Sequence, residues 1–195
     1  MSVSAFAAPQ DPPMPIQRCE QQMPFGIPQV RKDDSVQICR KAYALEYDNK
    51  AKIPVWVSYM LTPDHTTGCV KRSNAFAADL SLRPDARSTL RDYNNSGYDT
   101  GHIANNADIA LVVARNHPIL VYAGPIYRYD DPTIGPNHVI IPSGFYKILV
   151  DVITRDVLQH TQIQFPLPPG AKFSPNTWPS KSRSVVQQKR NSCSW

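Results

Sequence analysis

The sequence is short of glycine, of long apolar runs and of closely spaced cysteines, and each shortage narrows the kinds of protein that it encodes. Only 8 of the 195 residues are glycine, whereas 19 are proline. Because proline interrupts helices and the interior of sheets, this composition favours a loop-rich α+β domain over a helical bundle. No apolar run is long enough to span a membrane, and no internal repeat is visible. Without a break in composition, residues 9–195 are expected to form a single domain.

The cysteines are few and widely spaced, at Cys19, Cys39, Cys69 and Cys193. No Cys-x-x-Cys pair is present, so the spacing is not that of a zinc site. An even number favours disulfides, and sequence order predicts one between Cys19 and Cys39 and another between Cys69 and Cys193. Three connectivities are open from the sequence alone.

The first eight residues resemble the small-residue end of a secretory signal, because Ser4–Ala8 precede Pro9. We therefore interpret residues 1–8 as a signal remnant or added start. Combined with the expected disulfides, this predicts a secreted or periplasmic protein, since disulfides persist in oxidising compartments.

Positive charge exceeds negative charge, with 21 lysines and arginines against 16 acidic residues and a net charge of +5. Such an excess favours an anionic partner. Nucleic acid is favoured over a membrane because no basic amphipathic helix is visible. The same excess is typical of the solvated surface of any basic protein, so charge alone does not decide.

Apolar stretches predict a set of strands. A run from Val36 to Tyr47 and another from Ile53 to Leu61 flank turn residues 48–50, which is typical of an antiparallel hairpin. Side chains alternate between the two faces of a strand. The second run is therefore expected to place Val55, Val57 and Tyr59 on one face, and Trp56, Ser58 and Met60 on the other. Further strands are expected over residues 119–126, 139–142, 145–152 and 162–167, with the second and third of these paired through residues 143–144.

Three arginines recur every four residues, at Arg83, Arg87 and Arg91. A helix would place them on one face. That face is either a phosphate-binding surface directed at the polar stretch that follows or an ordinary solvated helix face.

The most polar part of the chain, residues 98–108, holds the candidate catalytic residue, His102. Histidine is the side chain whose ordinary pKa lets it accept a proton from water near neutral pH. Gly101 lets the backbone approach a bulky group such as a phosphate. Asp99, or a backbone carbonyl, is a candidate to orient the imidazole. By itself this short motif fits a turn as well as a catalytic site.

Four blocks in order resolve that ambiguity. They are Pro54–Thr62, Asp99–His102, Tyr122–Ile126, and Ile141-Pro142 with Phe145–Lys147. Their sequence and order resemble the DNA/RNA non-specific endonuclease family, which includes secreted sugar-non-specific nucleases and mitochondrial endonuclease G. The resemblance extends from about Ala42 to Pro166. It implies a six-stranded antiparallel β-sheet core flanked by helices, with a ββα-metal (His-Me finger) active site.

The resemblance also implies a mechanism. His102 would act as general base on the water that attacks phosphorus, and one hydrated Mg²⁺, or another divalent cation, would stabilise the leaving oxygen. Because such an enzyme grips phosphates and does not read bases, DNA and RNA are both expected partners. Binding should weaken as salt rises.

Two positions depart from the family pattern. Thr100 stands where the family's Asp-Arg-Gly-His signature has arginine, and Arg83, Arg87 or Arg91 is a candidate to replace that charge. In addition, Asp108 is followed almost directly by Leu111–Pro118, so the family's metal-binding helix is missing between the signature and the Gly-Pro-Ile strand.

Three explanations follow from the missing segment: a shortened and inactive relative, a sequence that joins two pieces across an omitted loop, or a rebuilt metal site. For the last, Asn105, Asn106 and Asp108 are candidate oxygen ligands, although the two asparagines also fit a polar turn. Asn116 and His117 are expected at the end of a helix and not at a metal. The leading function is a metal-dependent endonuclease, and the alternative is an inactive nucleic-acid-binding relative.

Overall fold

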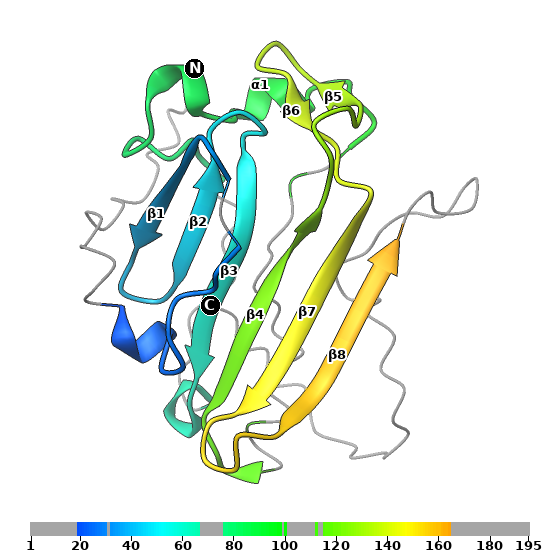
Figure 1. Ribbon diagram of the computed structural model, residues 1–195. Helices are drawn as coiled ribbons and strands as arrows, with labels where there is room; N and C mark the ends of the chain where they lie inside the picture. Colours follow the sequence, from blue (N-terminus) through cyan, green and yellow to red (C-terminus); the bar gives the residue numbers. More distant parts are fainter. Residues whose placement is uncertain are drawn as a thin grey trace, which may run out of the picture.

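A six-stranded antiparallel sheet forms the centre of the molecule (Figure 1), with strands in the order β1-β2-β3-β4-β7-β8. The computed structural model describes residues 19–30, 32–66, 76–98, 100, 112 and 115–164. The strands are β1 (Ser35–Cys39), β2 (Ala44–Asp48), β3 (Ile53–Leu61), β4 (Ile119–Ile126), β7 (Gly144–Asp151) and β8 (Val157–Gln164). The six-stranded antiparallel core that the family resemblance implied is confirmed.

The run from Val36 to Tyr47 does not form one strand. It divides into β1 and β2, which pair with each other from Ser35 opposite Asp48 to Cys39 opposite Ala44. The expected hairpin is therefore the one between β2 and β3. Strand β4 has the predicted bounds, and its apolar sequence is accounted for by its central position between β3 and β7.

Apolar side chains pack on both faces of β3. Val57, Tyr59 and Leu61 pack with residues of β4 and β7 in one buried cluster. Trp56 belongs to a second cluster with both cysteines of the N-terminal part. The two-face prediction is wrong for Val55, which joins the cluster of Trp56. A register shift between β2 and β3 at this point inserts an extra residue, and such a bulge breaks strict alternation.

Two short strands form a separate hairpin, β5 (Thr133–Ile134) with β6 (Val139–Ile140). The prediction that residues 139–142 pair with the following strand is wrong, because β7 pairs with β4 and β8. Strand β8 begins at Val157, five residues before its predicted start, and residues 165–167 lie outside the described part of the chain.

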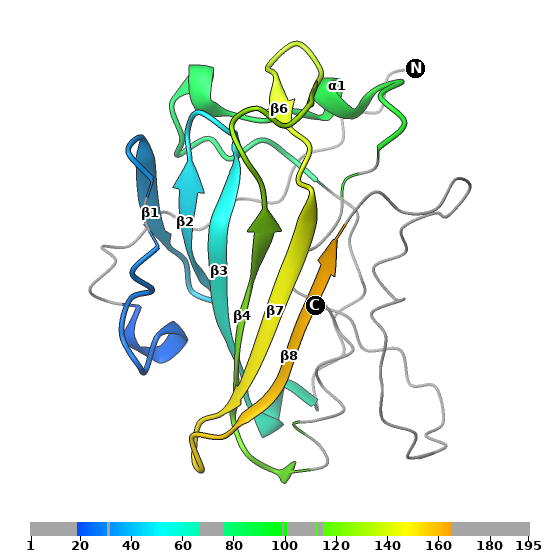
Figure 2. The ribbon, with the colours of Figure 1, turned by 45° about the vertical axis from the view of Figure 1, so that its right-hand side comes forward.

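Helices are short in the described part of the chain. They comprise the 3₁₀ turns η2 (Glu20–Gln22), η3 (Pro63–Thr66) and η4 (Pro84–Ala86), and α1 (Leu90–Tyr93). None of the helices in these ranges has the length and apolar character to cross a membrane. Both ribbon views place α1 beside the β5–β6 hairpin at one end of the sheet (Figure 2).

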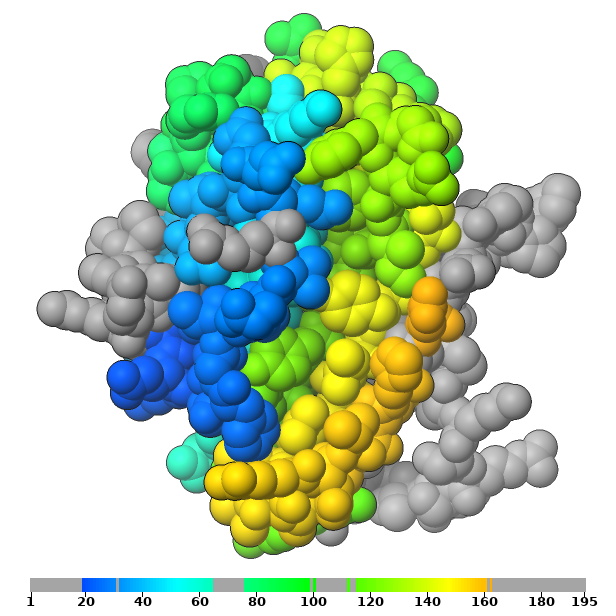
Figure 3. All heavy atoms as spheres, viewed as in Figure 1, coloured from blue at the N-terminus to red at the C-terminus, as the bar shows by residue number. Residues whose placement is uncertain are grey.

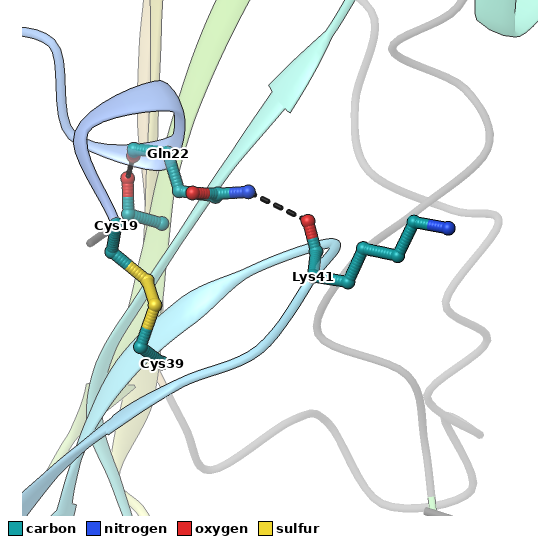
Figure 4. The surroundings of a disulfide bond; sticks show 5 residues. Cys19, Gln22, Cys39 and Lys41 are labelled. Atoms are coloured by element: carbon teal, nitrogen blue, oxygen red, sulfur yellow. Dashed lines mark hydrogen bonds between the residues drawn. A yellow bond between two sulfur atoms is a disulfide. The ribbon is translucent and has the colours of Figure 1, made fainter. Parts of the chain in front are cut away.

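A buried disulfide fixes the N-terminal segment to the sheet. Cys19 is bonded to Cys39 at the end of β1, with 5.8 Å between their Cα atoms, as predicted (Figure 4). The Gln22 side chain donates to the carbonyl of Lys41 at 2.7 Å. In the space-filling view the N-terminal residues (blue) cover part of one face of the sheet (Figure 3). The second predicted disulfide, between Cys69 and Cys193, lies outside the described residues.

Candidate functional site

The polar stretch predicted to carry the chemistry follows α1. The described chain leaves α1 through a turn, where the amide of Ser96 donates to the carbonyl of Tyr93 at 3.2 Å, and continues through Tyr98 and Thr100. Asp99, His102 and Asn105 lie outside the described residues, as do Asn106 and Asp108. The structure therefore defines the surroundings of the stretch, beginning with α1.

A capping box starts α1. Thr89 and Asp92 exchange hydrogen bonds, with the amide of Thr89 donating to Asp92 Oδ2 at 2.7 Å and the Thr89 hydroxyl contacting the same oxygen at 3.0 Å. This satisfies amide groups that a helix start leaves without partners. A threonine followed three residues later by an acid is the sequence signal for such a start.

Asp92 also anchors α1 to the β5–β6 hairpin. Its fully buried carboxylate accepts the backbone amide of Asn137 at 2.8 Å and the Asn137 side-chain amide at 2.9 Å. Gly135 lies directly against it, because a Cβ there would overlap the Cα of Asp92. Burial acts to raise the pKa of Asp92, but the hydrogen bonds from Asn137 and Thr89 prevail, and the pKa lies below its ordinary value.

The three arginines do not share a helix face, so that prediction is wrong. Arg83 precedes Pro84 with an extended backbone, as residues before proline tend to have. Arg87 is extended as well, at the end of η4. Only Arg91 lies in α1, because the helix begins at Leu90 after the Thr89 cap.

The three arginines also have different hydrogen-bond and ion-pair partners. Arg87 donates to two backbone carbonyls of its own loop, those of Leu82 and Leu80, both at 2.8 Å. Arg83 is exposed and forms ion pairs of 3.5 Å with Asp34 and Asp85. Arg91 is exposed on α1, and none of the ion pairs among the described residues involves it. Of the three arginines, Arg91 therefore differs from the others in lying on α1 and in forming none of these hydrogen bonds or ion pairs.

A pocket of about 150 Å³ lies beside α1 and reaches the polar stretch at Thr100. One wall comes from the loop before η4 and the other from the start of α1: Phe76, Ala77, Ala78, Ser88, Thr89, Leu90, Tyr93 and Thr100. Thr100 precedes the predicted catalytic residue, His102, by two positions in the sequence.

The loop wall of this pocket has its own buried anchor. The Arg40 guanidinium, at the end of β1, donates to both carboxylate oxygens of Asp79, at 3.0 and 2.9 Å, and to the Ser81 hydroxyl at 2.7 Å. Burial acts to raise the pKa of Asp79, but hydrogen bonds from Ser81 and Arg40 lower it below its ordinary value. The two pocket walls are thus held by separate polar anchors, one to β1 and one to the β5–β6 hairpin.

Asn116 and His117 have the structural roles expected of them. The amide of Asn116 donates to the carbonyl of Val112 at 2.8 Å, and its φ of 53° is the left-handed conformation that often ends a helix. Nδ1 of His117 lies 2.9 Å from Asp151 Oδ2, and Arg115 lies 3.5 Å from the same oxygen. Burial acts to raise the pKa of Asp151, but the contact with His117 and two backbone amides lower it to about 2.

Two buried carboxylates on β2 were not identified from the sequence. Asp48 accepts the hydroxyls of Tyr127 at 2.7 Å and Tyr129 at 2.9 Å. Glu46 accepts the indole N–H of Trp56 at 3.2 Å and the Ser35 hydroxyl at 2.6 Å. Such acids are costly to bury unless hydrogen-bonded. The partners of Asp48 are 79 and 81 positions away in the sequence, so local residue patterns do not reveal its contacts.

No group of three or more histidine, cysteine or acidic side chains in the described ranges has the arrangement of a metal site. The oxygen ligands considered for Mg²⁺ all lie in residues 101–111, outside those ranges. The described residues therefore supply the scaffold, the exposed Arg91 and the pocket.

Comparisons with known proteins agree with this arrangement. Residues 23–116 match the sequence profile of the DNA/RNA non-specific endonuclease family. Mitochondrial endonuclease G from Bos taurus is 26% identical over 174 positions, which cover 65% of this chain and 56% of that protein. The Homo sapiens protein is 25% identical, with 65% and 57% covered. Nuclease C1 from Cunninghamella echinulata var. echinulata is 31% identical over 87 residues, which are 43% of this chain and 33% of that protein.

The fold agrees as well. A chain in the crystal structure of the EndoG/EndoGI complex superposes with a TM-score of 0.59 and 26% identity, over 72% of this chain and 76% of that one. This chain spans a little over half the length of its mitochondrial relatives. Each alignment with endonuclease G has 174 positions but includes only 65% of this 195-residue chain. The relatives therefore contain positions with no counterpart in this chain.

Proposed function

Because residues 23–116 match the DNA/RNA non-specific endonuclease family and the fold is similar to that of endonuclease G, we propose that this chain hydrolyses phosphodiester bonds in both DNA and RNA. The observation that carries the proposal is the position of His102. It lies inside the family-matched range, three residues after Asp99 and directly after Gly101, on the segment that follows α1. A neutral imidazole there would remove the proton from the attacking water.

The substrate would be held through its phosphates. Arg91 projects from α1 with no ion pair among the described residues, so its charge is available to a phosphate, whereas Arg87 is committed to its own loop. Arg91 would supply the charge that Thr100 does not. Such contacts carry no base information, which fits a non-specific enzyme with a net charge of +5.

We propose a divalent cation, with Mg²⁺ preferred, as cofactor. When bound, it would offset the negative charge that develops on the phosphate and the leaving oxygen. Asn105, Asn106 and Asp108 carry the hard oxygen atoms that Mg²⁺ prefers, and they are close in sequence to His102.

We also propose that the protein works in an oxidising compartment, outside the cell or in a periplasm. The support is the buried Cys19–Cys39 disulfide, which joins the N-terminal segment to the sheet. Structural disulfides of this kind are rare in reducing compartments.

The test combines cleavage with binding. Plasmid DNA and a long RNA are incubated with the purified protein in Mg²⁺ or in chelator, and binding in chelator is followed across a salt series. Cleavage of both polymers that requires metal supports the proposal. Salt-dependent binding with no cleavage at any metal concentration identifies the inactive relative, the function favoured by Thr100 and the shortened segment. Absence of both overturns both readings.

A further inference from the structure

The pocket between the 76–78 loop and α1 combines aromatic and hydroxyl side chains. Phe76 and Tyr93 contribute rings, Leu90 and two alanines contribute apolar surface, and one serine and two threonines add hydroxyl groups. Every described lining side chain is uncharged. A pocket for a phosphate would be expected to present a cation, so this lining fits a neutral, flat and partly polar group.

The size of the pocket narrows the choice. Its volume of about 150 Å³ is below the roughly 300–1,000 Å³ of ordinary small-molecule pockets. It therefore suits one ring system and not a complete nucleotide. The Thr89 hydroxyl contacts Asp92 and the Ser88 side chain contacts the Tyr47 hydroxyl, so Thr100 is the hydroxyl of this lining that we assign to a ring edge.

We infer that this pocket holds one unpaired nucleobase of the bound strand, next to the phosphate that is cleaved. The inference rests on the proposed nuclease function. Thr100 lines the pocket and precedes His102 by two residues, and Arg91 is the neighbour of Leu90 on α1. A base held here would thus be bound by residues that neighbour, in the sequence, both the proposed base catalyst and the proposed phosphate contact.

A consequence follows for the kind of nucleic acid. Any of the bases presents a flat face to an aromatic side chain, so the pocket adds affinity without adding sequence specificity. A base can reach it only after leaving its stack, which costs least in a single strand. Single-stranded or locally opened substrates should therefore be preferred over intact duplex.

The test uses two oligomers of equal charge: an octathymidylate and an eight-residue oligomer of abasic deoxyribose, with fluorescence anisotropy measured in chelator. The unmodified protein should bind the thymidylate roughly tenfold more tightly, the scale of one base–aromatic stack. The substitution Ala77→Phe fills the pocket from an exposed position and should reduce thymidylate binding to the abasic level. Ala42→Phe, at an exposed turn residue between β1 and β2, should leave the difference intact.

The results separate the two proposals. Equal binding of both oligomers by the unmodified protein, or full thymidylate binding by Ala77→Phe, overturns the pocket inference while the nuclease proposal stands. Failure to bind either oligomer overturns both. If Ala77→Phe fails to fold, Phe76→Leu removes one lining ring and should reduce the preference for thymidylate. Phe25→Leu, which alters a 45% exposed ring of the N-terminal segment, is its matched control.

Discussion

The anchor of α1 at Asp92 provides the sharpest stability prediction. Its buried carboxylate contacts the amide and hydroxyl of Thr89 and the backbone and side-chain amides of Asn137. Replacing Asp92 with alanine removes the capping box and leaves two backbone amides without their acceptor. A lost cap costs about 0.5–2 kcal/mol, and each unsatisfied buried amide costs about 1–3 kcal/mol.

We therefore expect Asp92→Ala to lower the free energy of unfolding by about 3–5 kcal/mol, a large part of the roughly 5–15 kcal/mol of a typical domain. Urea denaturation measures the change. The control is Asp85→Asn, because Asp85 is 73% exposed and pairs with Arg83 only at 3.5 Å, and it should shift stability by less than about 0.5 kcal/mol. An equal effect of the two substitutions would refute the anchor.

The lowered pKa of Asp92 also predicts how the stability of the protein changes with pH. Because the pKa of Asp92 is lower in the folded protein than in the unfolded chain, the unfolded chain binds the proton more readily in acid. The stability it contributes is therefore complete above its unfolded pKa and is lost as pH falls through the folded value. Asp92→Asn should flatten the acid limb of a stability–pH curve. An unchanged acid limb would contradict this contribution.

The remaining predictions concern the hairpin, the arginines and the disulfide. Gly135→Ala should destabilise the protein by at least about 1 kcal/mol, because the residue has a φ of +67° and its new Cβ would overlap Asp92. An unchanged melting temperature would contradict this prediction. Arg91→Ala should weaken oligonucleotide binding and reduce the salt slope by about one contact, whereas Arg87→Ala should lower stability and leave the slope unchanged. Reversed effects would assign the phosphate to Arg87. Cys39→Ser should cost about 2–4 kcal/mol in denaturant, and a reducing agent should destabilise the unmodified protein more than it destabilises that variant.

The central strands were predictable because their sequence signals are local. Residues 119–126 form a nearly continuous apolar run, and β4 has those bounds. The division of the run from Val36 to Tyr47 was missed because it depends on the turn at Arg40–Tyr43, where the amide of Arg40 donates to the carbonyl of Tyr43 at 2.8 Å. The helix through three arginines was wrong because four-residue spacing ignored Pro84, although proline and the residue before it disfavour a continuing helix.

The site was only partly predictable. The sequence indicated the histidine stretch and a family through the order of its motifs, and residues 23–116 match the model of that family. It did not indicate the support around that stretch. Asp92 and Asn137 are 45 positions apart, and Arg40 and Asp79 are 39 apart. Contacts between residues so far apart in the sequence depend on the topology of the sheet. Local residue patterns do not predict such individual contacts.

The most direct measurement is the single-turnover rate of plasmid cleavage in Mg²⁺ for the unmodified protein, His102→Ala and His160→Ala. His160 is exposed on β8, so its replacement controls for the general loss of a histidine. We predict that His102→Ala lowers the rate at least about 100-fold, the usual contribution of a general base, while binding in chelator is retained and His160→Ala cleaves normally. Cleavage by His102→Ala at the unmodified rate would contradict the assignment of His102 as the base.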